Sequence, residues 1–284
     1  MDVPARDEGP DDARPSQRAP VSTAERPAPT PPAASGSGGA RATWRGVLSR
    51  GGGLVLDVLG RYGAFVAFAI TVLVFSLVDG KSFWGWGNWE DMLAGAAVPA
   101  IVACGLTVVL TMNDFDLSFG ATIGFGGSMA VILAANHGAS WPLALLAAIA
   151  IGVGVGVVNG VLVAYAGGSS FIITLATATI IGGLEVSQTY SLTIYQGIPS
   201  SFVQLGQGVL WGLHYPVYIA LGVGLLLWLL LSQSEWGRYM TAVGGNPEAA
   251  RLTGVRTRFL RLMGFVIVGA CAALAGVQIG RAHV

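Results

Sequence analysis

The sequence predicts an all-α fold, a polytopic transmembrane helical bundle of about seven spans. Hydrophobic residues make up 53% of the chain and charged residues only 11%, whereas soluble domains carry about 25% charged residues. No lysine or arginine occurs from Ser82 to Gly237, and a stretch without cations suits the interior of a bilayer. The apolar runs are roughly 20 residues long, which favours helices over the short alternating strands of a membrane barrel.

The chain begins with a segment of different composition. Residues 1–50 are rich in proline, alanine, serine, aspartate and arginine, and large apolar residues are scarce. Such a segment buries too little apolar surface to offset its conformational entropy. We expect a disordered cytoplasmic tail, either an inert solvated extension or a regulatory one. The absence of an apolar core after the first charges argues against a secretory signal.

Seven apolar blocks within residues 51–278 predict one transmembrane domain. The third block is short, at about 17 residues, near the lower limit for crossing roughly 30 Å of hydrocarbon, which favours a broken or re-entrant element. The fifth is short and rich in threonine, and the sixth is interrupted by His214 and Pro216. In chain order the expected spans are Tyr62–Val78, Met92–Met112, Phe119–Ala135, Pro142–Tyr165, Phe171–Val186, Val209–Leu231 and Phe259–Gln278.

Arginine placement predicts the orientation of the spans. One cluster of eight arginines lies at 6–61 and a second, of five, lies at 238–261. Because six spans separate them, both clusters fall on one side, which the positive-inside rule makes the cytoplasm. The stretch SFWGWGNW, Ser82–Trp89, falls on the other side, and its three tryptophans suit the outer interfacial belt. We expect the N-terminus and the segment 238–258 to be cytoplasmic.

The polar segment between the last two spans carries the signals of a short helix. Asn246 is a good N-cap, and Pro247 suits the first helical position, where a missing N–H costs nothing. Glu248 and Arg251 lie near helix ends of opposite partial charge, and Gly254 can adopt the left-handed conformation that closes a helix. The expected helix is about seven residues or ~10 Å long, too short to be stable alone in water. It either packs on its own protein as a loop cap or docks into a cytoplasmic partner.

Three segments resemble one family of transport proteins. GGNPEAARLTGV, Gly244–Val255, looks like the cytoplasmic coupling segment of the ribose/xylose/arabinose-type permeases of ABC importers, in the wider group that includes branched-chain amino-acid permeases. LTVVLTMNDFDLSFGATIGFGG, Leu106–Gly127, is similar to the family's Gly-Gly-Ile-Asp-Leu-Ser-Val-Gly stretch. GVGVGVVNGVLVAYAGGSSFIITLATATIIGGL, Gly152–Leu184, matches its Asn-Gly and Phe-Ile-Thr-Leu signals. The resemblance covers Trp89–Gln278, in the family's order.

Two departures from the family pattern fall in the second segment. Asn113 and Asp114 replace the usual glycine pair, and Phe115 replaces isoleucine. The choice of solute or the shape of its pathway can therefore differ from that of the sugar members.

The resemblance implies a role for the short helix. In this family it sits in a cleft of a soluble ATPase subunit and transmits ATP-driven closure of the ATPase dimer to the membrane spans. The two alanines allow close approach to the partner, and the charged ends fix the register of the contact. The residues that the resemblance assigns to ATPase coupling are Gly245, Asn246, Pro247, Glu248, Ala249, Ala250, Arg251 and Gly254.

The resemblance also implies an assembly. Family members function as two permease chains, here expected to be a homodimer, with two ATPase domains and an extracytoplasmic solute-binding protein, in the lipid of the plasma (inner) membrane. This chain has no Gly-x-x-x-x-Gly-Lys-Ser/Thr loop, so the expected ATP site belongs to a partner. The chain is then a transport subunit rather than an enzyme, and no cofactor, metal or nucleic acid is implied.

Five residues are candidates for the translocation path: Asp116, Ser118, Asn159, Phe171 and Thr174. An acid within a membrane is a functional candidate because burying a carboxylate in hydrocarbon is costly. Other interpretations stay open, since Asp116 also suits a cap of the next helix and Asn159 suits an interhelical hydrogen bond. The favoured interpretation of Asp114 is that it is solvated at the cytoplasmic surface.

The remaining reactive side chains favour plain interpretations. Cys104 and Cys271 lie inside apolar spans without CxxC spacing and are expected to be buried apolar residues. Glu185 ends the fifth span and is expected to be solvated. His137 and His214 lack metal-ligand spacing, and neither is expected to be catalytic.

These inferences predict the permease subunit of an ABC importer for a monosaccharide. Within transport, the alternatives are a nucleoside, a branched-chain amino acid or a signalling sugar as the solute. A secondary carrier driven by an ion gradient is a different class, but it has no reason to keep the Asn246–Thr253 helix. An intramembrane enzyme lacks support because the spans hold neither a nucleophile paired with a base nor a metal-ligand cluster.

The last residues predict that the true protein is longer. GACAALAG, Gly269–Gly276, is a small-residue face suited to a close helical neighbour, and no later span remains to supply one. Permeases of the resembled family continue with further spans. The final stretch IGRAHV, Ile279–Val284, resembles a common sequencing adapter read in frame. We therefore expect residues 279–284 to be non-native and the domain to be incomplete at its C-terminus.

Overall fold

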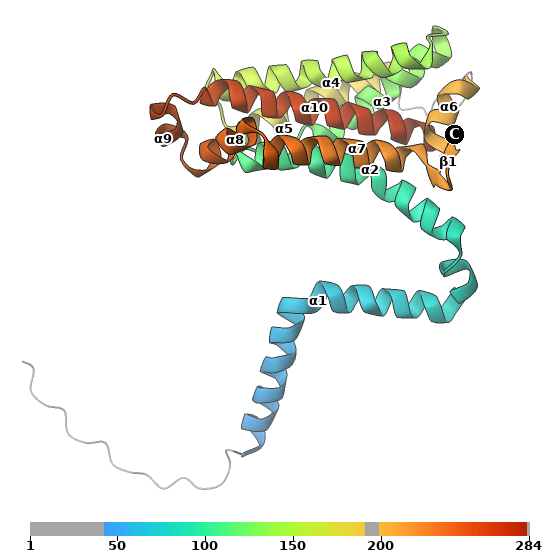
Figure 1. Ribbon diagram of the computed structural model, residues 1–284, viewed down its shortest axis with the longest axis vertical. Helices are drawn as coiled ribbons and strands as arrows, with labels where there is room; N and C mark the ends of the chain where they lie inside the picture. The colour runs from blue at the N-terminus through green and yellow to red at the C-terminus, as the bar shows by residue number, and fades with distance from the viewer. Residues whose placement is uncertain (1–42, 191–198, 283–284) are drawn as a thin grey trace, which may run out of the picture. The chain divides into compact units, whose positions relative to one another are not determined.

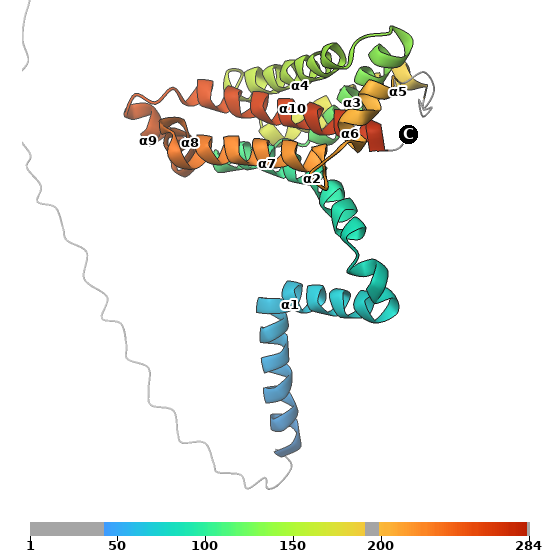
Figure 2. The ribbon, with the colours of Figure 1, turned by 45° about the vertical axis from the view of Figure 1, so that its right-hand side comes forward.

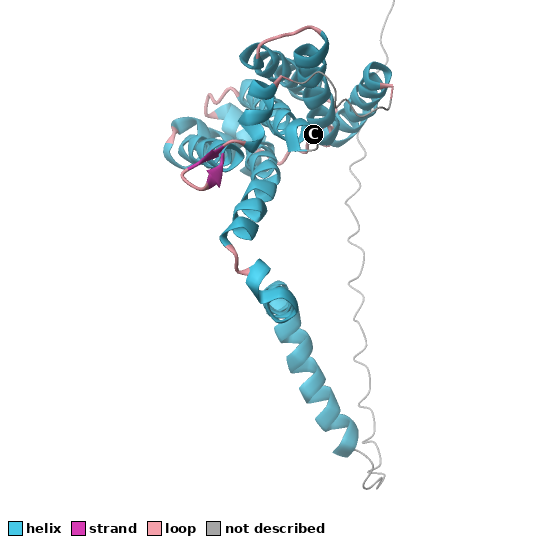
Figure 3. Ribbon diagram, turned by 90° about the vertical axis from the view of Figure 1, so that its right-hand side faces the viewer, coloured by secondary structure: helices cyan, strands magenta, loops and turns pink. Residues whose placement is uncertain are grey.

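The computed structural model describes residues 43–190 and 199–282. The chain divides into two compact units, Met1–Ala67 and Phe68–Val284, and helix α1, Thr43–Phe83, extends across the boundary between them. The described residues are almost entirely helical, and a single pair of two-residue strands is their only sheet (Figure 3). The predicted all-α class is confirmed.

Seven helices of the described residues are long and apolar enough to cross a membrane, as predicted. The third, α3, has only 18 residues. The sixth consists of α7 followed by a π-helix, η1. In chain order the spans are Arg61–Phe83 within α1, Trp86–Thr111 (α2), Phe119–Asn136 (α3), Trp141–Ala164 (α4), Ser170–Thr189 (α5), Tyr215–Trp228 with Leu229–Gln233 (α7 and η1), and Thr257–Ile279 within α10, Thr257–Ala282.

The predicted boundary of the N-terminal tail is wrong. Helix α1 begins at Thr43, so residues 43–50 are helical, and residues 1–42 lie outside the described part of the chain. The apolar residues Trp44, Val47 and Leu48 recur at helical spacing and account for this earlier start.

The predicted start of the sixth span is also wrong. A hairpin of two short antiparallel strands, β1 (Val209–Leu210) and β2 (Leu213–His214), precedes α7. Trp211 and Gly212 form its turn with positive φ values of 50° and 80°, as a two-residue hairpin loop requires. Pro216 then lies in the first turn of α7, where its missing N–H breaks no helical hydrogen bond.

Helix α10 lies at the centre of the bundle. It packs against α2, α3 and α4, and it lies between α4 and α7 in Figures 1 and 2. In its most apolar stretch 61% of the residues are buried, the highest share of the seven spans. Glycines allow this packing, because Gly152 of α4 lies against the backbone of Gly269 and Gly127 of α3 lies against that of Gly276.

The small-residue face of α10 therefore has neighbours within this chain. The premise that Gly269–Gly276 needs a later helix is wrong, because α3 and α4 cover this face. The backbone of α10 also stays helical to Ala282, past the predicted end of the span at Gln278. That residues 279–284 are non-native stays a prediction, and residues 283–284 lie outside the described part of the chain.

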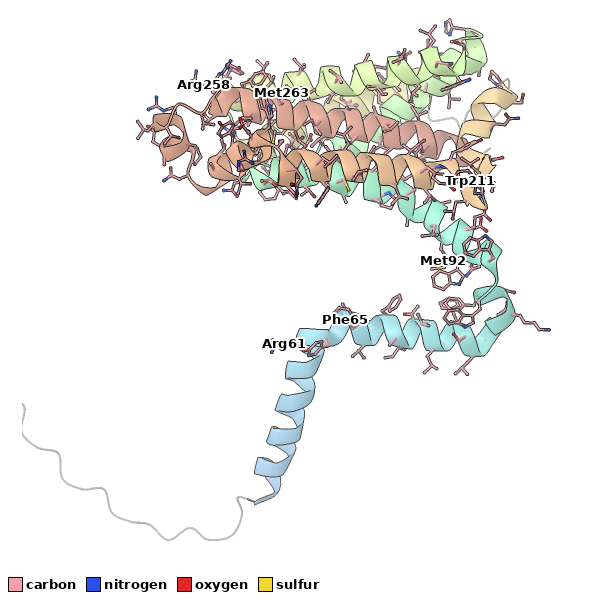
Figure 4. All side chains as sticks on the ribbon, in the orientation of Figure 1. Arg61, Phe65, Met92, Trp211, Arg258 and Met263 are labelled. Carbon is pink, nitrogen blue, oxygen red and sulfur yellow. The ribbon has the colours of Figure 1, made fainter. Side chains whose placement is uncertain are left out.

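The two ends of the bundle differ in their elements. One end, named here the α9 end, holds α8 (Glu235–Gly245), α9 (Pro247–Leu252) and the start of α10 (Figure 1). The opposite end, named the α6 end, holds α6 (Ser200–Gln207), the two strands and the last turns of α10. Figure 4 labels Arg258 at the first end and Trp211 at the second.

Candidate functional site

Helix α9 is capped at both ends, as predicted. The side-chain oxygen of Asn246 accepts hydrogen bonds from the backbone N–H groups of Glu248 (3.1 Å) and Ala249 (3.0 Å). Pro247 takes the first helical position. Gly254 follows the helix with a φ of 88°, the left-handed conformation that favours glycine. The helix has six residues, one fewer than expected.

One face of α9 packs on the chain itself. Ala250 is buried in an apolar cluster with Met240 and Val243 of α8 and Leu260 of α10. The expectation that both alanines approach a partner is therefore wrong for Ala250, which contacts its own bundle. This packing supplies the tertiary support that so short a helix needs.

The opposite face of α9 is exposed and charged. Glu248, Ala249, Arg251 and Leu252 are all exposed. Arg251 donates two hydrogen bonds to Glu248, from Nε to Oε2 (3.1 Å) and from Nη2 to Oε1 (2.6 Å). These bonds lower the pKa of the Glu248 carboxyl and raise that of the Arg251 guanidinium. The packed face agrees with the interpretation of α9 as a loop cap, and docking of the exposed face into a cytoplasmic partner stays a prediction.

An aromatic groove, which no pattern in the sequence predicts, lies beside α9. The groove encloses about 330 Å³ and is lined by Trp236 and Tyr239 of α8, Phe259 of α10 and the connection at Thr253–Arg256. Trp236 and Tyr239 are exposed, and the rings of Trp236 and Phe259 lie 5.9 Å apart. Leu252, next to Thr253 in the chain, is 76% exposed. Exposed apolar residues that gather at one place are a signal for a protein contact.

Asp114 forms a buried ion pair, which the sequence analysis also missed. Arg261 of α10 donates two hydrogen bonds to it, from Nε to Oδ2 (2.7 Å) and from Nη2 to Oδ1 (2.6 Å). The Asp114 side chain is only 3% exposed, so the expectation that it is solvated is wrong. Two-point pairing of this kind is strong and directional. It clamps the α2–α3 connection to the first turns of α10.

The residues before α3 run extended along the start of α5. The Phe115 N–H donates to Ser170 Oγ (3.2 Å), and the Leu117 N–H donates to Thr174 Oγ1 (3.0 Å). A non-helical segment packed among membrane helices needs such partners for its backbone. The third span itself is one continuous helix, α3, so the broken or re-entrant element that its shortness favours stays a prediction.

A chain of hydrogen bonds joins α3, α4 and α5. Asp116 Oδ1 accepts from the Ser118 N–H (2.7 Å) and from its hydroxyl (2.6 Å). The Ser118 hydroxyl accepts from Asn159 Nδ2 (2.8 Å), and the Thr177 hydroxyl donates to Asn159 Oδ1 (2.7 Å). Burial raises the pKa of the Asp116 carboxyl, while the bonds from Ser118 lower it in part. We name this set, Asp116, Ser118, Asn159 and Thr177, the polar network.

The structure brings together four of the five predicted path residues. Asp116, Ser118, Asn159 and Thr174 are buried and bonded within the network or the adjoining extended segment. Phe171 is exposed on α5 and takes no part. The bonds that Asp116 and Asn159 make support the two structural interpretations, a helix start and an interhelical link.

A comparison with known families decides the class of protein. A family described as branched-chain amino acid transport system / permease component matches residues 88–281. The chain belongs to this permease family. The matched region includes α9, the ion pair and the polar network.

The permease is similar to several curated sugar permeases. It is 30% identical over 217 residues to the D-allose transport system permease protein AlsC of Escherichia coli (strain K12), across 76% of this chain and 66% of the relative. It is 29% identical over 218 residues to the ribose import permease protein RbsC of Haemophilus influenzae, across 75% and 66%. It is 35% identical over 225 residues to the galactofuranose transporter permease protein YtfT of Escherichia coli (strain K12), across 75% and 64%. The chain thus spans about two thirds of the length of these relatives, and no solved structure matches it.

Other reactive side chains of the permease lie apart from these sites. Within the described residues, no group of three or more His, Cys, Asp or Glu could hold a metal ion. Cys271 is buried, as predicted, whereas Cys104 is half-buried, and both are free thiols. Glu185 is half-buried, with its carboxylate against Gly124 of α3, and the expectation that it is solvated and not functional stays a prediction.

Proposed function

We propose that this permease is the membrane subunit of an ABC importer for a monosaccharide. The relatives are named for transport of allose, ribose and galactofuranose. The observation that carries the proposal is α9, which is capped at both ends, held on the bundle by Ala250 and exposed on its charged face. A soluble ATPase subunit needs an exposed element of this kind as a docking site, whereas a secondary carrier has no ATPase subunit to dock.

The proposed importer contains two copies of the permease, a separate ATPase and an extracytoplasmic solute-binding protein. The ATPase takes the exposed face of α9 into a cleft, with Leu252 and the aromatic groove at the edge of the contact. ATP is bound and hydrolysed on that partner, so the permease makes and breaks no covalent bond. Its contribution is a path for the solute and a mechanical link to the motor.

We assign the α9 end to the cytoplasm and the α6 end to the outer side of the plasma (inner) membrane. Five arginines belong to the segment 238–261 at the α9 end, and cytoplasmic loops are enriched in arginine. Trp84, Trp86 and Trp89 lie around the start of α2, at the opposite membrane interface. With seven spans this orientation also puts the N-terminus in the cytoplasm.

The packing around α9 gives the motor a stiff connection to the spans. Ala250 shares one apolar cluster with Met112 at the end of α2 and with Leu260 of α10. Gly244 of α8 lies directly against the Thr111 carbonyl. Since packed interiors transmit displacement rather than absorb it, a push on α9 reaches α2, α8 and α10 together.

The polar network, in this proposal, supports the path and leaves solute binding to other residues. Asn159 is fully buried, and its amide is bonded on both sides, to Ser118 and to Thr177. An amide whose hydrogen bonds are already made gains little free energy from binding a hydroxyl of the solute. Asp116 and Thr174 hold the extended segment in place beside the route, and Phe171 faces lipid or the second permease chain.

Reconstitution with the ATPase and the binding protein in proteoliposomes tests the coupling. Glu248→Pro removes an N–H that Asn246 caps, and Leu252→Glu adds charge to the exposed face without touching the bundle. We expect both to lower ATPase association and uptake at least tenfold while the permease stays in the membrane. Trp211→Ser, at the α6 end, is the matched control for ATPase association. Normal uptake by both variants contradicts the coupling role, and uptake without ATPase, driven by an ion gradient, indicates a secondary carrier.

A further inference from the structure

Gln278 of α10 is a buried amide without partners. Only 3% of its surface is exposed, and neither Nε2 nor Oε1 has a hydrogen-bond partner. The same holds for just one other side-chain atom of the described residues, Nδ1 of His214. An unpaired polar group inside a protein is costly, so its place in a membrane span calls for a ligand.

Gln278 lines a cavity at the α6 end. It encloses about 500 Å³ between α2, α6, α7 and α10, within the range of ligand sites, about 300–1,000 Å³. Gln278 lines its wall, and Asp91 of α2 lies at its rim with a side chain 81% exposed. Gly95 and Gly206 keep the space open because they carry no side chains. Asp91 and Pro99 are eight positions apart on α2, so the cavity follows that helix for ~12 Å.

The donor set selects the chemistry of the occupant. An amide is neutral and offers two donors and one acceptor, which two adjacent hydroxyls of one molecule can satisfy together. Asp91 adds an acceptor for a further hydroxyl. Among the described residues that line the cavity none has a cationic side chain, so none of them offers a counter-ion to a free anion or to the carboxylate of a zwitterionic amino acid. A neutral polyhydroxylated solute fits, and a branched-chain amino acid does not.

We infer that Gln278 contacts the solute in an outer subsite for a neutral monosaccharide, which the carbohydrate enters from the α6 end before it crosses. This inference rests on the proposed function and adds to it a site for that class of solute. It also assigns different roles to two buried polar groups. The polar network near the α9 end stabilises the fold, because its members are hydrogen-bonded to one another. The Gln278 amide, which has no partner in the described structure, binds the solute.

Removal of the amide tests the subsite. Gln278→Met keeps the length of the side chain and removes its hydrogen bonds, Gln278→Asn keeps the amide, and Thr179→Val is the matched control. Thr179 is exposed and bonds only its own helix in the described structure. Each variant is assembled with the ATPase and binding protein, and uptake of D-ribose, D-allose and D-galactose is measured with saturating binding protein. For whichever sugar the wild type carries, we expect Gln278→Met to lower maximal uptake about tenfold, the factor that one lost hydrogen bond gives.

Two further readouts separate solute contact from structural support. Gln278→Met should leave the unfolding temperature of the assembly unchanged or raise it, because it removes an unsatisfied buried group. Gln278→Asn should keep more uptake than Gln278→Met. A fall in unfolding temperature that accounts for the lost uptake overturns the inference, as does wild-type uptake by Gln278→Met.

Solute protection supplies a test that is independent of turnover. In a chain with Cys104→Ala and Cys271→Ala, Gln278→Cys is labelled in the assembly with a small impermeant thiol reagent, with Trp211→Cys as the exposed control outside the cavity. The transported sugar should slow labelling at 278 and not at 211, and L-leucine should slow neither. No labelling at 278, no protection by the sugar, or protection by L-leucine overturns the subsite. Wild-type uptake of none of the three sugars refutes the proposed solute class itself, whatever Gln278 does.

Discussion

The two ends of the bundle treat their buried polar groups in opposite ways. Near the α9 end, Asp114 is paired with Arg261, and Asn159 is bonded to Ser118 and Thr177. At the α6 end, both polar atoms of Gln278 lack partners, and this residue lines a cavity. A satisfied group fixes a structure, whereas an unsatisfied one is available to a ligand.

The difference matches what each end has to do in an importer. The ATPase can move the membrane spans only through a rigid connection, and the hydrogen-bonded α9 end supplies one. A solute must be held weakly and released, which suits an open cavity with few polar groups. His214, at the α6 end, has one nitrogen of each kind. Its Nε2 lies 3.6 Å from Glu90, while its Nδ1 has no hydrogen-bond partner.

The ion pair gives the largest expected effect. Arg261→Met leaves the Asp114 carboxylate buried and alone, so we expect the free energy of unfolding to fall by ~3 kcal/mol, the loss typical of a broken buried pair. Denaturant titration of the purified permease in mixed micelles measures it. Arg258→Met is the matched control, since Arg258 is exposed on the same helix, and it should change stability by less than ~0.5 kcal/mol. Equal effects of the two would remove the pair from the account of the α9 end.

A pair of amide substitutions tests the contrast between the two ends directly. Asn159→Leu removes the bond that the Ser118 hydroxyl accepts and the bond that the Thr177 hydroxyl donates, and it should lower the free energy of unfolding by ~2 kcal/mol. Gln278→Met should cost nothing or stabilise, because it leaves no partner unpaired. Asn136→Leu, at an exposed position on α3, controls for the chemistry of the exchange. Similar losses at 159 and 278 would mean that the two ends do not differ in the way described.

The sequence was informative where the decisive residues are close together in the chain. Asn246, Pro247 and Gly254 lie within nine positions, and the capped helix they predict is present. The turn at Trp211–Gly212 is just as local, but it lies within an apolar run, and that run predicts a membrane span from Val209. Hydrophobicity outweighed turn chemistry in that prediction, since tryptophan rarely takes a positive φ.

Pairings across the bundle could not be predicted from the sequence. Asp114 and Arg261 are 147 positions apart, so nothing local shows that the arginine used for topology also neutralises the acid. Ala250 packs against α8 and α10, and the amino-acid composition of α9 does not show which of its faces meets those helices. Gln278 looked like the end of a span, and only the packing around it shows an amide without partners.

The cap of α9 gives a smaller effect at the same end. Asn246→Ala removes the acceptor for two N–H groups and should destabilise the helix by ~1 kcal/mol, which corresponds to about fivefold weaker ATPase association. Asn246→Asp keeps the acceptor oxygen and should bind the ATPase as the wild type does. Titration of labelled permease in nanodiscs with ATPase gives the affinities. Equal weakening by alanine and aspartate would show that the asparagine contacts the partner and does not act through the cap.

The smallest expected effect concerns the charge on the exposed face of α9. Arg251 lowers the pKa of the Glu248 carboxyl below its ordinary value of 4.5. A depressed carboxyl pKa contributes order to the helix above that ordinary value and loses it only as pH falls through the lower, folded value. Because both side chains are exposed, salt screens the pair and its contribution is small. The ratio of ATPase affinities between wild type and Glu248→Gln should therefore stay constant from about pH 8 to about pH 5.5 and shrink in high salt. If the ratio already falls at about pH 6, the Glu248 carboxyl titrates above its ordinary pKa. Arg251 is then not hydrogen-bonded to it, and the exposed face of α9 does not have the ion pair described.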